Sequence, residues 1–171
     1  MSPSRPLSLA LLLAMPAALS CRPAPRPPAE AEASAGAPLG AADLAAIGAA
    51  DSAFEAATNA GDAEGVVEVY ASDASLLPPN VPGMKGTDAI RGFWGGFLAA
   101  YDVRMELQTD QTDGRGDLAY VVGRYRFTGT PKTKGPPEIK DEGKFVEVIR
   151  RQADGSWKYV VDIYNSDLPV K

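Results

Sequence analysis

Asp162 is the residue whose position in the sequence most suggests chemistry. It lies late in an apolar, strand-like run at residues 157–164, where an unpartnered carboxylate would be costly to bury. Burial raises the pKa of a carboxyl group, and a raised pKa suits a general base near neutral pH. Asp162 is therefore the candidate catalytic residue. The alternative is a structural aspartate that pairs with Lys144 or Arg124, or that caps the turn after the strand.

Two polar residues near Asp162 are candidates for the same site. Lys144 lies at the start of the preceding strand-like run, 143–152, and either lines a pocket beside Asp162 or is a solvated lysine at the sheet edge. Asn165 follows Asp162 by three residues and can hydrogen-bond a ligand or the backbone, and the backbone is the commoner partner.

Aromatic residues supply the candidate walls of a ligand pocket. Phe54 and Trp94 are more often core residues than ligand platforms, but a buried Trp nitrogen needs a partner, which favours a half-polar site. Tyr70 is open to both interpretations. Tyr125 and Arg124 point to opposite faces of a strand. Tyr125 points inward if residues 121, 123 and 127 form the core face, and the opposite orientation stays open.

The chain contains no histidine. Ser-His-Asp and Cys-His catalysis and the common zinc sites are therefore excluded, and acid–base chemistry must come from Asp, Glu, Lys or Tyr. We expect neither a metal nor a cofactor. The formal net charge of −5 argues against binding to nucleic acid and against general adhesion to anionic membranes.

The first 40 residues are expected to lie outside the folded domain. Residues 1–20 form a secretory signal peptide, with Arg5 ahead of an apolar stretch that is too short for a normal membrane span. Ala18-Leu19-Ser20-Cys21 is similar to a bacterial lipoprotein cleavage site, which makes Cys21 the lipidated residue; ordinary secretion is the alternative. Residues 21–40 then form a tether rich in Pro and Ala.

Residues 41–171 form one domain with helices first and strands after. Hydrophobic periodicity predicts helices over 42–60, 63–70 and 87–100. Strands are predicted over 74–77, 103–112, 117–129, 138–152 and 156–164, with an Asp154-Gly155 turn before the last strand. This order predicts an α+β fold. Three glycines in the third helix suggest close approach to a neighbouring backbone or a ligand, with tolerated sequence drift as the alternative.

The order and spacing of several short segments resemble the nuclear transport factor 2-like superfamily, in particular its SnoaL-like and domain-of-unknown-function 4440 branches. The segments are Asn59-Ala-Gly-Asp62, Tyr70-Ala-Ser-Asp-Ala74, Gly86-Thr-Asp-Ala-Ile-Arg91, Gly123-Arg-Tyr125 and the closing hairpin. The resemblance covers residues 42–169. It implies a cone-shaped, curved antiparallel sheet wrapped around three N-terminal helices, with a pocket at the open end, as in the related cystatin-like folds. It also implies a homodimer through the exposed sheet face, with which Trp157 and Tyr159 on one face of the last strand are compatible.

Two functions are compatible with these features. In the first, the chain is an exported, lipid-anchored binding or assembly module for a small apolar molecule, held in the bacterial periplasm or outer membrane by its anchor alone. In the second, which the resemblance implies, the domain is a ketosteroid-isomerase-like or SnoaL-like isomerase, cyclase or hydrolase. Asp162 would abstract a proton from a small apolar carbonyl compound, and Tyr125 or Lys144 would stabilise the enolate.

Overall fold

The computed structural model describes residues 36–169. The predicted signal peptide, Cys21 and most of the predicted tether lie outside the described residues. Within the described part, no helix combines the length and the apolar character that a bilayer span requires.

Three helices precede most of the sheet. The first, α1 (Ala41–Ala60), begins where the Asp43 carboxylate accepts a hydrogen bond from the Gly40 amide at 3.1 Å, and it ends at Gly61, whose φ of 71° favours glycine. The short α2 (Ala63–Glu68) is capped by Asp62, which accepts from the Gly65 amide at 3.0 Å. The third helix is α3 (Thr87–Ala100). The predicted helices are therefore present within two residues of their predicted bounds.

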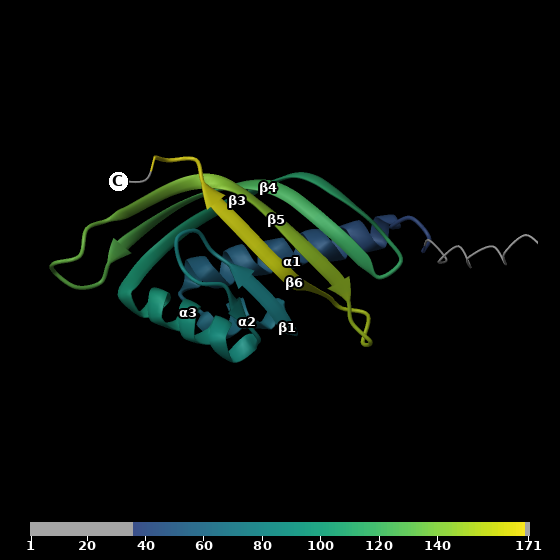
Figure 1. The fold of residues 1–171 in the computed structure, drawn as a ribbon, viewed down its shortest axis with the longest axis horizontal. Coiled ribbons are helices and arrows are strands. Elements are labelled where there is room, and N and C mark those ends of the chain that lie inside the picture. The colour runs from purple at the N-terminus through teal and green to yellow at the C-terminus, as the bar shows by residue number, and fades with distance from the viewer. Residues whose placement is uncertain (1–35, 170–171) are drawn as a thin grey trace, which may run out of the picture. The chain divides into compact units, whose positions relative to one another are not determined.

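Six strands form one curved sheet that arches over α1 and α3 (Figure 1). The strands are β1 (Tyr70–Leu77), β2 (Met84–Lys85), β3 (Tyr101–Arg115), β4 (Leu118–Pro131), β5 (Ile139–Arg151) and β6 (Trp157–Ser166), in the order β2-β1-β6-β5-β4-β3. The expected α+β fold with a curved sheet is confirmed. Two features were not predicted: the two-residue strand β2, and the parallel pairing of β1 with β6, which makes the sheet mixed. A long crossover separates these two strands in the chain, and it permits the parallel direction.

The core lies between the concave face of the sheet and the helices. The helices contribute apolar side chains such as Ile47 and Ile90, and the sheet contributes Val121 and Ile149, all of them fully buried. Trp157 and Tyr159 belong to this core, with exposed fractions of 5% and 0%. They point toward the helices and not toward solvent, so the expectation that they support a dimer on the exposed sheet face is wrong.

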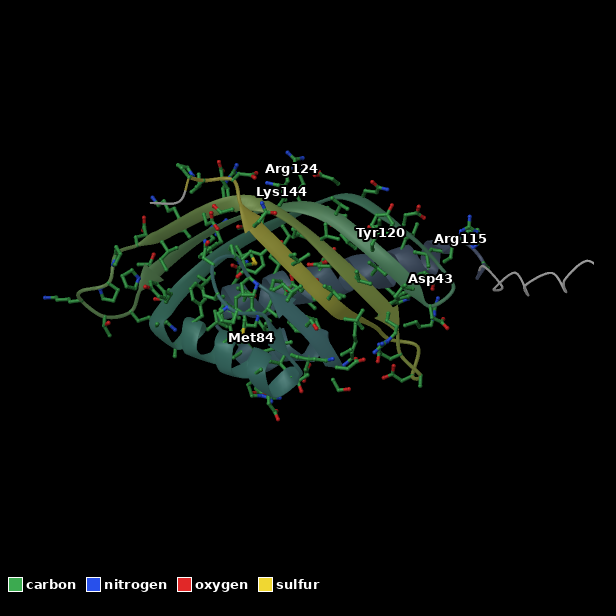
Figure 2. All side chains as sticks on the ribbon, in the orientation of Figure 1. Asp43, Met84, Arg115, Tyr120, Arg124 and Lys144 are labelled. Carbon is green, nitrogen blue, oxygen red and sulfur yellow. The ribbon has the colours of Figure 1, made fainter. Side chains whose placement is uncertain are left out.

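The end of the predicted tether lies against the sheet. The carbonyl of Ala37 accepts a hydrogen bond from the Gly116 amide at 2.9 Å, and Pro38 forms a bridge with Arg115 at the β3–β4 turn. Figure 2 places Arg115 at this end of the domain, close to where α1 begins. Residues 37 and 38 therefore belong structurally to the domain.

The glycines of α3 do not bring a neighbouring backbone close. A Cβ atom added at Gly92, Gly95 or Gly96 would meet no atom within 4 Å among the described residues. The close approach expected from their clustering is absent in this part of the chain, and α3 tolerates the three glycines on open faces.

Candidate functional site

A small cavity opens between α1, α3 and the concave face of the sheet. Its volume is about 100 Å³, which is room for several waters or a small organic molecule. Eight of the twelve lining residues are aromatic, two are aliphatic or thioether side chains, and two are acids. They are Phe54, Phe93, Trp94, Phe97, Met105, Leu107, Tyr125, Phe127, Phe145, Glu147, Asp162 and Tyr164. Such a lining suits a mostly apolar ligand with one polar group.

Three of the predicted pocket residues line this cavity. Phe54 comes from α1, Trp94 from α3 and Tyr125 from β4. Phe54 and Trp94 pack edge to face at 5.4 Å between ring centroids. Tyr125 takes the inward orientation, and Arg124 points outward to an ion pair with Asp110 at 2.8 Å.

Tyr70 lies behind the cavity wall and does not line the cavity. It is 2% exposed, and its hydroxyl donates a hydrogen bond to Oδ2 of Asp162 at 2.5 Å. The pairing of β1 with β6 brings the two side chains together. Tyr70 therefore acts on the site through Asp162.

Lys144 and Asn165 lie on the outer face of the sheet. They are opposite each other on β5 and β6, both are exposed, and Lys144 pairs with Asp167. Figure 2 shows Lys144 and Arg124 on the side of the sheet away from the helices. The expectation that Lys144 and Asn165 line the pocket is therefore corrected. Strand alternation explains the result, because Gly143 and Phe145 occupy the inward positions of β5.

Asp162 does point into the cone. It lines the cavity and is 5% exposed. Strict alternation from the inward Tyr159 would turn Asp162 outward, but an irregularity in the β5–β6 register at Val160 inserts one extra residue. Neither Lys144 nor Arg124 pairs with Asp162. Its hydrogen-bond partner is the hydroxyl of Tyr70.

Two further buried acids lie beside Asp162, and the sequence-based prediction missed both. Glu147 of β5 is opposite Asp162 of β6 and is 3% exposed, and Asp51 of α1 is 6% exposed. Asp51 accepts hydrogen bonds from the hydroxyls of Tyr159 at 2.9 Å and Thr109 at 3.2 Å. The signals were present: Glu147 interrupts an inward row with Phe145 and Ile149, and Asp51 shares the buried stripe of α1.

Burial raises the pKa of all three acids. Burial raises the pKa of Asp162 to about 6, although the hydrogen bond from Tyr70 lowers it. Burial, followed by the charges of Asp51 and Asp162, raises the pKa of Glu147 well above its ordinary value. Burial also raises the pKa of Asp51, opposed by hydrogen bonds from Tyr159 and from Glu147. At neutral pH Asp162 is therefore mostly ionised, and burial favours the protonated form of Glu147.

Two polar atoms in the cavity wall have no partner among the described residues. They are Oε2 of Glu147 and the indole nitrogen of Trp94, both buried. Because an unpaired buried polar group is destabilising, such atoms are expected where a ligand or a bound water completes the hydrogen bonding.

The sequence profile of the SnoaL-like domain matches residues 52–160, which is more than half of the chain. The chain therefore belongs to the SnoaL-like domain family. A sequence search of curated proteins finds no match.

Solved structures share the fold. A ketosteroid isomerase-like protein from Erwinia carotovora atroseptica is 24% identical, with a TM-score of 0.67 over 74% of this chain and 97% of that one. A candidate dehydratase of the nuclear transport factor 2-like family from Streptomyces avermitilis is 20% identical, with a TM-score of 0.64 over 75% and 99%. A protein of unknown function with a cystatin-like fold from Nostoc punctiforme is 18% identical, with a TM-score of 0.64 over 75% and 94%. At these identities the likeness concerns the fold alone.

Proposed function

We propose that the domain binds a small, largely apolar molecule in the cavity between α1, α3 and the sheet. The observation that carries the proposal is the lining itself, in which aromatic side chains surround Asp162 and Glu147. A cavity with an apolar wall and few convergent polar groups is the usual form of a small-molecule site. The fold is compatible with this role and with an isomerase or dehydratase role.

Propylbenzene is a suitable first probe, because Trp94 lines the cavity and the other tryptophan, Trp157, does not. In a Trp157→Phe background, we expect the probe to change the fluorescence of Trp94 with saturation. Leu107→Phe should fill the cavity and abolish the change. Leu118→Phe, at a site 52% exposed on β4, is the matched control and should leave it intact. No saturable change in the background variant would contradict the proposal.

A second candidate function is proton transfer, favoured by two adjacent buried carboxyl groups, Asp162 and Glu147, whose pKa values are both raised. Neighbouring acids whose pKa values are pushed apart are suited to act as base and acid. Asp162 would take a proton from the carbon beside a carbonyl group, and the protonated Glu147 would donate to the carbonyl oxygen. Lys144 cannot stabilise an enolate here because it lies on the outer face. The hydroxyl of Tyr125 already donates a hydrogen bond to the Asp141 carboxylate at 2.7 Å.

Exchange of a ketone's α-hydrogens in D₂O tests this second function. With 4-phenyl-2-butanone, we expect the chain to accelerate exchange, Asp162→Asn to abolish the acceleration and Glu147→Gln to reduce it. Glu142→Gln, on the outer face of the same strand, is the control and should exchange like the wild type. Equal rates in wild type and Asp162→Asn would contradict a catalytic role for Asp162.

We also propose that the chain is exported and anchored through Cys21. The support is the sequence of residues 1–21 alone. Cys21→Ser should move the protein from the membrane fraction to the soluble fraction of expressing bacteria, and unchanged membrane association would contradict the anchor.

A homodimer through the outer face of the sheet is the proposed assembly. Its support is two apolar residues, Val146 and Ile163, which are opposite each other on β5 and β6 and are 39% and 43% exposed. Exposed apolar residues grouped on one face are typical of an interaction surface.

A further inference from the structure

We propose that the cavity's ligand is an organic cation: an amine carried on an aromatic or aliphatic group. The inference deepens the proposed binding function and rests on it. It follows from the combination of buried acids without a basic partner, aromatic walls and an unpaired carboxyl oxygen.

The first observation is the missing counter-charge. Asp51, Glu147 and Asp162 are buried together, and no ion pair among residues 36–169 includes any of them. No Lys or Arg lines the cavity. Asp162 is the acid that is ionised at neutral pH, and buried ionised groups in proteins are normally paired with an opposite charge. A ligand cation would provide the compensation that the described chain does not provide.

The second observation is the character of the wall. Phe, Trp and Tyr rings present a negative face to a nearby cation, and cages of such rings recognise quaternary and protonated amines. Trp94, Phe97 and Tyr164 are among the eight aromatic residues around the cavity. Aromatic rings could equally enclose a neutral ligand, so the rings carry the inference only together with the acids.

The third observation is the unpaired oxygen of Glu147, a side chain that lines the cavity and is 3% exposed. A ligand ammonium group has several N–H donors and satisfies carboxylate oxygens that Tyr70 and Tyr159 do not reach. A metal ion is a poorer match. The described residues contain no group of three Cys, His, Asp or Glu side chains arranged to hold one.

Binding of a cation should release a proton from the site. A positive charge beside Glu147 favours its ionised form, so a site that is protonated when empty loses that proton when the amine enters. A neutral ligand gives no such release. The titratable groups that face Glu147 from the surrounding elements are Asp51 of α1, Tyr70 of β1, Tyr125 of β4, and Tyr159, Asp162 and Tyr164 of β6.

Isothermal titration of the full chain with two probes of one shape tests the inference. The probes are 2-phenylethylammonium and propylbenzene, which differ by an ammonium group in place of a methyl group. At pH 7, we expect the cation to bind about tenfold or more tightly than propylbenzene. Titrations in phosphate and in Tris should give different heats for the cation, because the buffer takes up the released proton.

Two variants and one control assign the effect to the acids. Glu147→Gln should weaken binding of 2-phenylethylammonium by about tenfold or more and abolish the buffer dependence, a much larger loss than it causes for propylbenzene. Asp162→Asn should also weaken binding of 2-phenylethylammonium more than binding of propylbenzene. Glu142→Gln, a surface change on the same strand, should bind both probes like the wild type.

The outcomes separate this inference from the function on which it rests. If propylbenzene binds as tightly as the cation, the cavity binds small molecules but the cationic ligand class is overturned. If neither probe binds while the protein is folded by its thermal unfolding curve, the proposed binding function fails and the inference fails with it.

Discussion

The hydroxyl of Tyr70 donates a hydrogen bond to Oδ2 of Asp162 at 2.5 Å, and this bond joins β1 and β6, the first and last strands along the chain and neighbours in the sheet. Both residues are buried, with exposed fractions of 2% and 5%. Three effects set the pKa of Asp162: burial raises it, the bond from Tyr70 lowers it, and the charge of Asp51 raises it. Burial is the largest effect, so the pKa stands at about 6.

Tyr70→Phe should raise the pKa of Asp162 further, because it removes the donor that stabilises the ionised carboxylate. The ring remains to fill the core, so the loss of stability should be that of one hydrogen bond to a charged group, about 1.5–3 kcal/mol. Carboxyl ¹³C NMR over a pH titration measures the pKa. Tyr164→Phe, in the same cavity, is the control. An unchanged pKa in Tyr70→Phe would show that the bond does not control the site.

The stability of the domain should fall as the pH rises through the range from about 4 to about 6. The folded-state pKa of Asp162 is about 6 against an ordinary value of 3.8, so the folded state binds more protons in this range and is favoured at its acid end. The shift corresponds to about 3 kcal/mol above pH 6. Asp162→Asn should reduce this dependence, leaving the part that comes from Asp51 and Glu147, and should stabilise the protein at pH 8, as measured by urea unfolding across the pH range. A wild-type free energy of unfolding that rises between pH 4 and pH 6 would contradict the assignment.

The fold could be predicted from the sequence because the local patterns of helix capping and strand alternation agreed with one another. Helix caps such as Gly61 and Asp62 and the alternating strands predicted the elements to within a few residues, apart from the start of β1 and the two-residue β2, which was not predicted. The parallel pairing of β1 with β6 could not be predicted, because the register between strands so distant in sequence depends on tertiary packing. Residues 70–73 of β1 carry no strong strand pattern of their own.

The site could be predicted only in part from the sequence, and two residues show why. The inward position of Asp162 depends on the bulge at Val160, which strict alternation cannot anticipate. Lys144 was predicted to lie beside Asp162 because the two charges are opposite. Its position between the inward Gly143 and Phe145 instead places it on the outer face of the sheet. Charge complementarity in sequence is thus a weaker guide than position on the strand.

The glycines of α3 offer stabilising substitutions. A Cβ atom at Gly95 or Gly96 would meet no atom within 4 Å, and neither residue has a positive φ. Each change to Ala should therefore raise the free energy of unfolding by about 0.5–1 kcal/mol, because alanine has the higher helix propensity. Gly123→Ala is the contrast. Its Cβ would lie 2.6 Å from the backbone oxygen of Gln108, so it should destabilise. Thermal unfolding compares the three variants, and destabilisation by Gly95→Ala and Gly96→Ala would contradict the open environment.

The outer face of the sheet should hold two copies of the chain together. Val146 and Ile163 are opposite each other on β5 and β6 and are 39% and 43% exposed, so a change at either position affects a grouped apolar surface. In a two-fold dimer each substitution occurs on both sides of the interface. Val146→Glu therefore introduces two like charges into an apolar contact, and it should convert a dimer to a monomer.

Sedimentation velocity at micromolar concentration distinguishes the two states. Val81→Glu is a matched control, because Val81 is 47% exposed but lies in the loop between β1 and β2, away from the outer face of the sheet. The control should remain dimeric, and Ile163→Glu should behave like Val146→Glu. A monomeric wild type would remove this face as an assembly surface. A dimer that survives both sheet-face changes would place the interface on another part of the domain, because a buried unpaired carboxylate is incompatible with a stable apolar contact.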